Sequence, residues 1–127
     1  MRDWGFPIGV HHLHEDTSLD FQLNRLATLG GGRLEEIRTV APRIRDLADW
    51  KREFLALADR AVSEDRSQNA AAYLRAAEFF MAPGDPDKPA AYERQAKLFR
   101  DLAAADFTSG HFMIRIISYL CCQIKSY

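Results

Sequence analysis

The feature that most constrains the fold is a set of apolar side chains spaced three and four residues apart through the middle of the chain. After Asp46 this spacing is kept by Leu47, Trp50, Phe54, Leu57, Ala58 and Ala61. After a polar turn at residues 63–67 it is kept again by Ala70, Tyr73, Leu74, Ala77, Phe80 and Met81. An α-helix brings such positions onto one face, so the two runs predict two amphipathic helices. The short turn between them predicts that the helices are antiparallel.

Two further helices are predicted on the N-terminal side of this pair. Thr17 or Ser18 can cap the first, because a hydroxyl oxygen accepts from a free main-chain N–H. Gly30-Gly31-Gly32 ends it, since glycine adopts left-handed dihedrals without penalty. The second runs from about Arg33 to Ala41, and Pro42 then breaks it. The faces expected to be buried are Leu19, Leu23 and Leu26 in the first helix and Leu34, Ile37 and Val40 in the second.

A fifth helix is predicted after the turn-rich connector at residues 83–89, with Pro89 in its first turn. It is expected to run to about Ala105, with a buried face of Tyr92, Ala96, Phe99 and Leu102 or Ala103. Beyond Asp106 the composition changes abruptly: residues 107–127 contain no acidic residue and no alanine, but four of the seven isoleucines. Isoleucine and tyrosine favour strands, so this tail is either a strand-forming end or a segment foreign to the fold.

The predicted architecture is therefore all-α, with four to five antiparallel helices in a helical-hairpin array. Residues 1–16 form an irregular arm, residues 17–106 the helical domain, and residues 107–127 an atypical hydrophobic tail that is a strand or disordered. Alanines at positions 70, 72, 76 and 77 permit close helix packing, which resembles the packing of tetratricopeptide-like hairpins. No second copy of the pattern exists, so a solenoid is not expected.

Composition and charge exclude several classes of protein. The 17 basic and 18 acidic residues are interspersed and give a net charge of -1, which does not favour nucleic-acid binding. The longest apolar stretch, residues 112–124, contains Arg115 and is far short of the roughly 20 residues that cross a membrane. The N-terminus lacks the apolar run of a secretory signal, so a cytoplasmic location without membrane attachment is expected. Cys121 and Cys122 are adjacent and are expected to be reduced thiols.

The first candidate for chemistry is the histidine cluster in the arm. His11, His12 and His14 could offer imidazoles to one metal ion, with Glu15 and Asp16 adding carboxylates. No distant fourth ligand and no helical spacing support the site, so a polar arm without a metal is the preferred interpretation. No metal and no cofactor are predicted.

Three other motifs resemble catalytic or phosphate-binding elements only in part. Ser109 has His111 nearby but lacks the glycine before the serine that a G-x-S-x-G elbow needs. Gly30-Gly31-Gly32 follows a helix and not a strand, which favours a helix terminator over a phosphate loop. Cys121 and Cys122 lie in apolar surroundings typical of inert thiols. No catalytic residue is predicted.

The aromatic residues allow two interpretations. They could line a ligand pocket, but helical spacing of aromatic side chains usually reflects core packing, which is therefore expected. The residues concerned are Trp50, Phe54, Tyr73, Phe80, Tyr92 and Phe99.

Several separated runs resemble one group of enzymes. These runs are residues 20–25 (DFQLNR), the glycines at 30–32, residues 37–50 (IRTVAPRIRDLADW) and residues 70–89 (AAAYLRAAEFFMAPGDPDKP). Over about residues 14–102 the chain resembles the N-terminal helical segment of bacterial α/β-fold hydrolases of the FrsA-like and dihydroxypseudooxynicotine-hydrolase-like groups. In that family the segment is a cap that packs on the catalytic domain and helps to enclose the substrate. The resemblance implies an esterase or acyl-hydrolase parent whose Ser-Asp-His domain is not in this sequence.

The resemblance thus implies a helical cap or lid segment that is inert alone, with a hydrolase catalytic domain as its partner and a homodimer as a further possibility. The alternative is a small helical-hairpin interaction module that binds a partner helix through its apolar face. The third interpretation is an independent enzyme or metal protein that uses the histidines of the arm.

Overall fold

The computed structural model describes residues 11–109, with side chains placed as far as Ala104. Within that range the chain has no strand and consists of α1 (Thr17–Thr28), α2 (Leu34–Val40), the 3₁₀ turn η1 (Ala41–Arg43), α3 (Leu47–Ser63), α4 (Ser67–Phe79) and α5 (Asp87–Ser109). The predicted all-α class is confirmed. None of these helices is both long and apolar enough to cross a bilayer.

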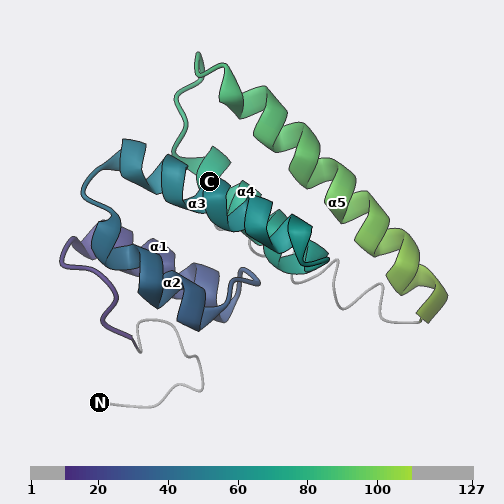
Figure 1. Cartoon of the computed structure of the whole chain (residues 1–127), viewed down its shortest axis with the longest axis horizontal. Coiled ribbons are helices and arrows are strands. Elements are labelled where there is room, and N and C mark those ends of the chain that lie inside the picture. The colour runs from purple at the N-terminus through teal and green to yellow at the C-terminus, as the bar shows by residue number, and fades with distance from the viewer. Residues whose placement is uncertain (1–10, 110–127) are drawn as a thin grey trace.

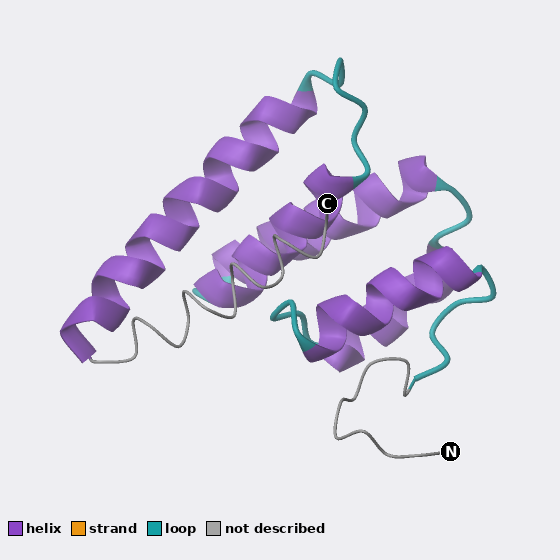
Figure 2. Ribbon diagram, turned by 180° about the vertical axis from the view of Figure 1, so that it is seen from behind, coloured by secondary structure: helices purple, strands orange, loops and turns teal. Residues whose placement is uncertain are grey.

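α4 is the central helix of the array. It packs against α3 on one side and against α5 on the other, and every side chain from Ala70 to Ala77 is buried. α5 is the outer helix in both views, while α1 and α2 lie beside each other next to α3 (Figures 1 and 2). The alanines of α4 allow its two neighbours to approach closely, because small side chains shorten the distance between helix axes.

Aromatic rings from α3 and α4 fill the centre of the core. The ring of Phe54 lies 4.7 Å from that of Trp50 and 6.1 Å from that of Tyr73, and Phe80 meets Trp50 edge-on at 5.0 Å. Trp50, Phe54 and Tyr73 are almost completely buried. The indole Nε1–H of Trp50 donates to the carbonyl of Ala76 at 2.8 Å, so its burial leaves no unpaired donor.

Carboxylates cap α1 and α3. Asp46 Oδ1 accepts from the N–H of Asp49 at 2.8 Å, so Asp46 caps α3, the helix that was predicted to follow it. For α1 the cap is Asp16, whose Oδ1 accepts from the N–H of Leu19 at 3.0 Å. The prediction of Thr17 or Ser18 as the cap was wrong by one or two positions, because the helix begins one residue earlier than a hydroxyl cap would require.

The glycine turn ends α1 as predicted. Gly30 donates to the carbonyl of Arg25, which also accepts from Leu29, and Gly32 donates to the carbonyl of Leu26, so carbonyls at the helix end are satisfied. Gly31 has a φ of 87°, a conformation that other residues adopt at a cost. A Cβ at Gly32 would lie 2.9 Å from side-chain atoms of Leu26 and Ile37. The turn therefore needs glycine both for its dihedral and for close packing onto α2.

Two residues assigned to buried faces are exposed. Leu47 in the first turn of α3 is 49% exposed, and Tyr92 on α5 is 57% exposed. α5 instead buries Ala91 and Gln95, with Leu98 packed against the core, so its contact face is turned one residue earlier. A small alanine at the contact suits the alanine-rich surface of α4, where a tyrosine ring would not fit.

The boundaries of two helices differ from expectation. α2 is Leu34–Val40, and the chain continues through Pro42 as the 3₁₀ turn η1. Proline is tolerated there because the first residues of a helical turn have no intrahelical acceptor for their N–H groups. α5 continues to Ser109, past the expected end near Ala105. The division of the chain at residue 106 stays a prediction, and residues 110–127 of the tail lie outside the described residues.

Candidate functional site

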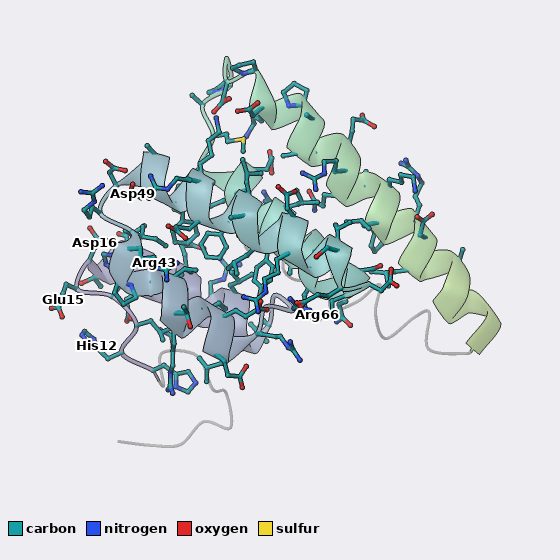
Figure 3. All side chains as sticks on the ribbon, viewed as in Figure 1. His12, Glu15, Asp16, Arg43, Asp49 and Arg66 are labelled. Carbon is teal, nitrogen blue, oxygen red and sulfur yellow. The ribbon has the colours of Figure 1, made fainter. Side chains whose placement is uncertain are left out.

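The three histidines of the arm have three different partners. His12 Nε2 lies 3.2 Å from Glu15 Oε1 at the surface, beside Asp16 (Figure 3). His14 Nε2 lies 2.6 Å from the carbonyl of Ile44, whereas His11 Nδ1 lies 3.3 Å from a guanidinium nitrogen of Arg38. No group of three potential metal ligands occurs among residues 11–109.

Two side chains of α1 hold the arm. Asp20 Oδ1 accepts from the main-chain N–H groups of Leu13 and His14 at 2.7 and 3.1 Å. The amide of Asn24 accepts from the N–H of His11 and donates to its carbonyl. Leu13 is buried in the core cluster. The described end of the arm therefore lies against α1 as an ordered part of the fold.

Glu36, Arg66 and Tyr73 form a polar cluster where α2 meets the start of α4. The two guanidinium ends of Arg66 donate to the two carboxylate oxygens of Glu36 at 2.8 and 3.1 Å. The hydroxyl of Tyr73 donates to Glu36 Oε1 at 2.8 Å and accepts from the N–H of Arg33 at 2.9 Å. Asn69 adds a bond to the carbonyl of Gly31. The cluster fixes the glycine turn and α2 on α4.

The environment of this cluster changes the acidity of two members. Partial burial alone would raise the pKa of Glu36, but the hydrogen bonds from Arg66 and Tyr73 outweigh it and hold the pKa below its usual value. Burial raises the pKa of Tyr73 to about 12, although the hydrogen bond from the N–H of Arg33 has the opposite effect and lowers it. Glu36 is therefore a stable carboxylate and Tyr73 a stable neutral phenol at neutral pH, an arrangement suited to structure and not to proton transfer.

A second charged cluster surrounds Asp49 in the first turn of α3. Its Oδ2 accepts from both the N–H and the guanidinium of Arg45, at 3.0 and 2.9 Å, and its Oδ1 lies 2.7 Å from Arg52. The bonds from Arg45 hold the pKa of Asp49 well below its usual range. A permanently ionised carboxylate near a helix N-terminus stabilises the helix.

A shallow groove lies between α2 and α3. Its volume is about 390 Å³, and its lining combines acidic and basic side chains with apolar surface. The lining residues are Glu35, Glu36, Thr39, Val40, Arg43, Glu53, Ala56, Leu57 and Arg60. Arg43 and Glu53 approach to 3.8 Å across it. The charges largely compensate one another, so the groove has no strong preference for ligands of one sign.

Four of the six aromatic residues expected in the core pack there, whereas Tyr92 is exposed on α5. Trp50, Phe54, Tyr73 and Phe80 are in contact with one another or with the core cluster. The large apolar side chains that are exposed are Phe21 on α1, Leu29 directly after it, Leu47 and Val62 on α3, and Tyr92 on α5. The guanidinium of Arg25 lies 5.7 Å from the ring centre of Phe21.

The remaining candidates have no catalytic setting in the described part of the chain. Ser109 is the last residue of α5, whereas the serine of a nucleophile elbow follows a strand. His111, Cys121 and Cys122 lie outside the described residues. The glycines at 30–32 join two helices and pack on side chains, as a terminator does.

Sequence reasoning missed the residues that organise the polar clusters. Glu36 and Arg66 are 30 positions apart, and Tyr73 bonds to the N–H of Arg33 across 40. No periodicity indicates such pairs. Asn24, which holds the arm, is a separate case: its amide is fully buried on α1, where an unpaired amide would be costly.

Comparisons of the chain with protein families, with curated proteins and with solved structures find no match.

Proposed function

We propose that the chain is a helical cap segment that docks on the catalytic domain of an α/β-hydrolase of the esterase or acyl-hydrolase type, and that it is inert without that domain. The observation that carries the proposal is that helices occupy most of residues 14–102, the range over which the sequence resembles such a cap. A cap works by packing on its enzyme and closing over the substrate, which excludes water from the reaction.

The exposed apolar side chains of α1 and of Leu29, the residue that follows it, support a docking face. Phe21 is 49% exposed and Leu29 is 36% exposed. They lie eight residues apart, so they are separated by about 12 Å along the helix on neighbouring sides of it. Burying a large apolar side chain at an interface contributes about 1.5 to 3 kcal/mol, which makes Phe21 the main expected anchor on the catalytic domain.

The test is reconstitution in trans. The 127-residue chain is mixed with the catalytic domain of a FrsA-like hydrolase from which the helical N-terminal segment has been removed. We expect a 1:1 complex by size-exclusion chromatography with light scattering, and a rise in kcat/KM towards a short-chain p-nitrophenyl ester. The chain alone should not hydrolyse the ester. Failure to associate with any hydrolase of the two groups would refute the proposal, as would ester hydrolysis by the chain alone.

Two substitutions of equal exposure sharpen the test. Phe21→Ser should weaken the complex about tenfold or more, whereas Leu47→Ser should leave it unchanged, although both side chains are 49% exposed. If the two variants lost equal affinity for the catalytic domain, the interface would lie elsewhere on the helical array.

The alternative function is a helical-hairpin module that binds a partner helix. The α3–α4 hairpin favours it, because Ala58, Ala61, Ala70 and Ala77 allow the tight packing of an independent helix pair. The coding region downstream discriminates the two: a second open frame with a G-x-S-x-G elbow supports the cap, whereas an intact unrelated neighbour supports the module.

A further inference from the structure

The hydrogen-bond partners of His14 determine which of its ring nitrogens carries the proton. The N–H of Asp16 lies 2.9 Å from Nδ1, and a main-chain N–H can only donate, so Nδ1 must accept. The carbonyl of Ile44 lies 2.6 Å from Nε2 and can only accept, so Nε2 must donate. Both contacts exist together in only one form of the ring, the neutral imidazole with its proton on Nε2.

His11 has the same requirement at the other end of the described arm. Its Nδ1 lies 3.3 Å from a guanidinium nitrogen of Arg38 on α2, and a guanidinium only donates. A second proton on His11 would remove the acceptor and place a positive charge beside Arg38. His12 is the opposite case, because its Nε2 faces the carboxylate of Glu15, and a protonated ring strengthens that contact.

We infer that residues 11–16 are an acid-released arm, held on α1, α2 and the η1–α3 connection by His11 and His14 in their neutral forms. Protonation of His14 turns Nδ1 into a donor that opposes the N–H of Asp16, so the turn at residues 14–16 opens. That turn leads directly into Asp16, the cap of α1, and it positions Leu13 in the core. Release of the arm therefore exposes the apolar surface that Leu13 covers and removes the Asp16 cap from the start of α1.

The charged groups around the arm determine whether protonation of His14 favours the docked or the rearranged arm. Asp20 binds the main-chain N–H groups of residues 13 and 14, and Glu15 and Asp16 lie beside His14 in the chain. On the opposite side, Arg43, Arg45 and Asp46 flank Ile44, and Arg38 faces His11. The carboxylates attract a protonated ring, but none of them can take the place of Nδ1 as acceptor for the N–H of Asp16 without moving the turn. The attraction thus favours a rearranged arm over the docked one.

The experiment is amide hydrogen exchange measured by NMR on the full chain at pH 7.5 and 5.5, with rates corrected for intrinsic exchange. Imidazoles ordinarily change charge in this range, whereas carboxylates ordinarily do so below it. We expect the protection of the Asp16 and Leu13 amides to fall about tenfold at pH 5.5, while the amides of the central helix α4 keep theirs. His12→Gln should behave like the natural chain. His14→Gln should remove the pH dependence at Asp16.

Two results would overturn the inference. One is protection at Asp16 that is unchanged between the two pH values, or that falls equally in His14→Gln. The other comes from the nitrogen chemical shifts of the His14 ring at pH 7.5, which report its tautomer without any substitution. A proton on Nδ1 would contradict the inferred contacts even if the variants failed to fold.

Discussion

Replacing Phe54 by alanine tests the core most directly. The Phe54 ring is fully buried, with ring neighbours Trp50 on its own helix and Tyr73 on α4. No polar group depends on it, so the loss is one of packing alone. The helices on both sides are fixed by their own bonds, including the contact of Trp50 with Ala76, and cannot collapse fully into the space.

The expected loss of unfolding free energy in Phe54→Ala has two contributions. Removing the apolar surface of the ring costs about 2 kcal/mol in transfer free energy. If about 100 Å³ stays empty, the cavity adds roughly 2.4 kcal/mol at about 24 cal/mol per Å³. We therefore expect Phe54→Ala to lower the free energy of unfolding by about 3 to 5 kcal/mol, a large share of the roughly 5 to 15 kcal/mol that stabilises a typical domain.

Urea unfolding followed by circular dichroism at 222 nm measures this loss. Leu47→Ala is the matched control on the same helix, and because Leu47 is half exposed its cost should stay below about 1 kcal/mol. If Phe54→Ala does not fold, Phe54→Leu should still show a partial loss. A loss below about 1 kcal/mol for Phe54→Ala would mean that the ring is exposed in solution, and the core assignment would be wrong.

The other predictions concern the polar cluster, the histidines and the tail. Tyr73→Phe should cost about 1 to 2 kcal/mol in urea melts, since the N–H of Arg33 and the carboxylate of Glu36 each lose a partner. Because the pKa of Tyr73 is raised from 10.0 to about 12, its contribution is present below pH 10 and is lost as the pH rises towards 12; melts between pH 9 and 11.5 should show a decline that Tyr73→Phe reduces. Zinc or nickel in mild excess should leave the Tm unchanged, and a rise abolished by His12→Ala and His14→Ala would restore the metal hypothesis. A chain ending at Asp106 should keep its helicity and cooperative melting and become more soluble, whereas lost cooperativity would make residues 107–127 part of the domain.

The sequence by itself determined the helices, because the side-chain spacing and the end residues of a helix depend only on residues close together in the chain. The spacing of Trp50, Phe54, Leu57 and Ala61 depends only on the period of one helix, and so does the face of Leu19, Leu23 and Leu26. Asp46 and Gly31 mark helix ends through dihedrals and bonds that involve only their neighbours. These features can be predicted without knowing which helix packs on which.

Only the tertiary structure decided how the helix faces meet and which polar groups pair. Tyr92 and Ala91 are adjacent on α5, and the alanine-rich surface of α4 selects the smaller one for burial. Glu36 meets Arg66, and His14 meets the carbonyl of Ile44, across 30 positions of chain each. Such contacts depend on the relative placement of whole elements, which no local period encodes. Of the histidines that resembled a metal site in the sequence, His11 and His14 contact Arg38 and Ile44 because α1, α2 and the η1–α3 connection come together around the arm, whereas His12 contacts only its neighbour Glu15.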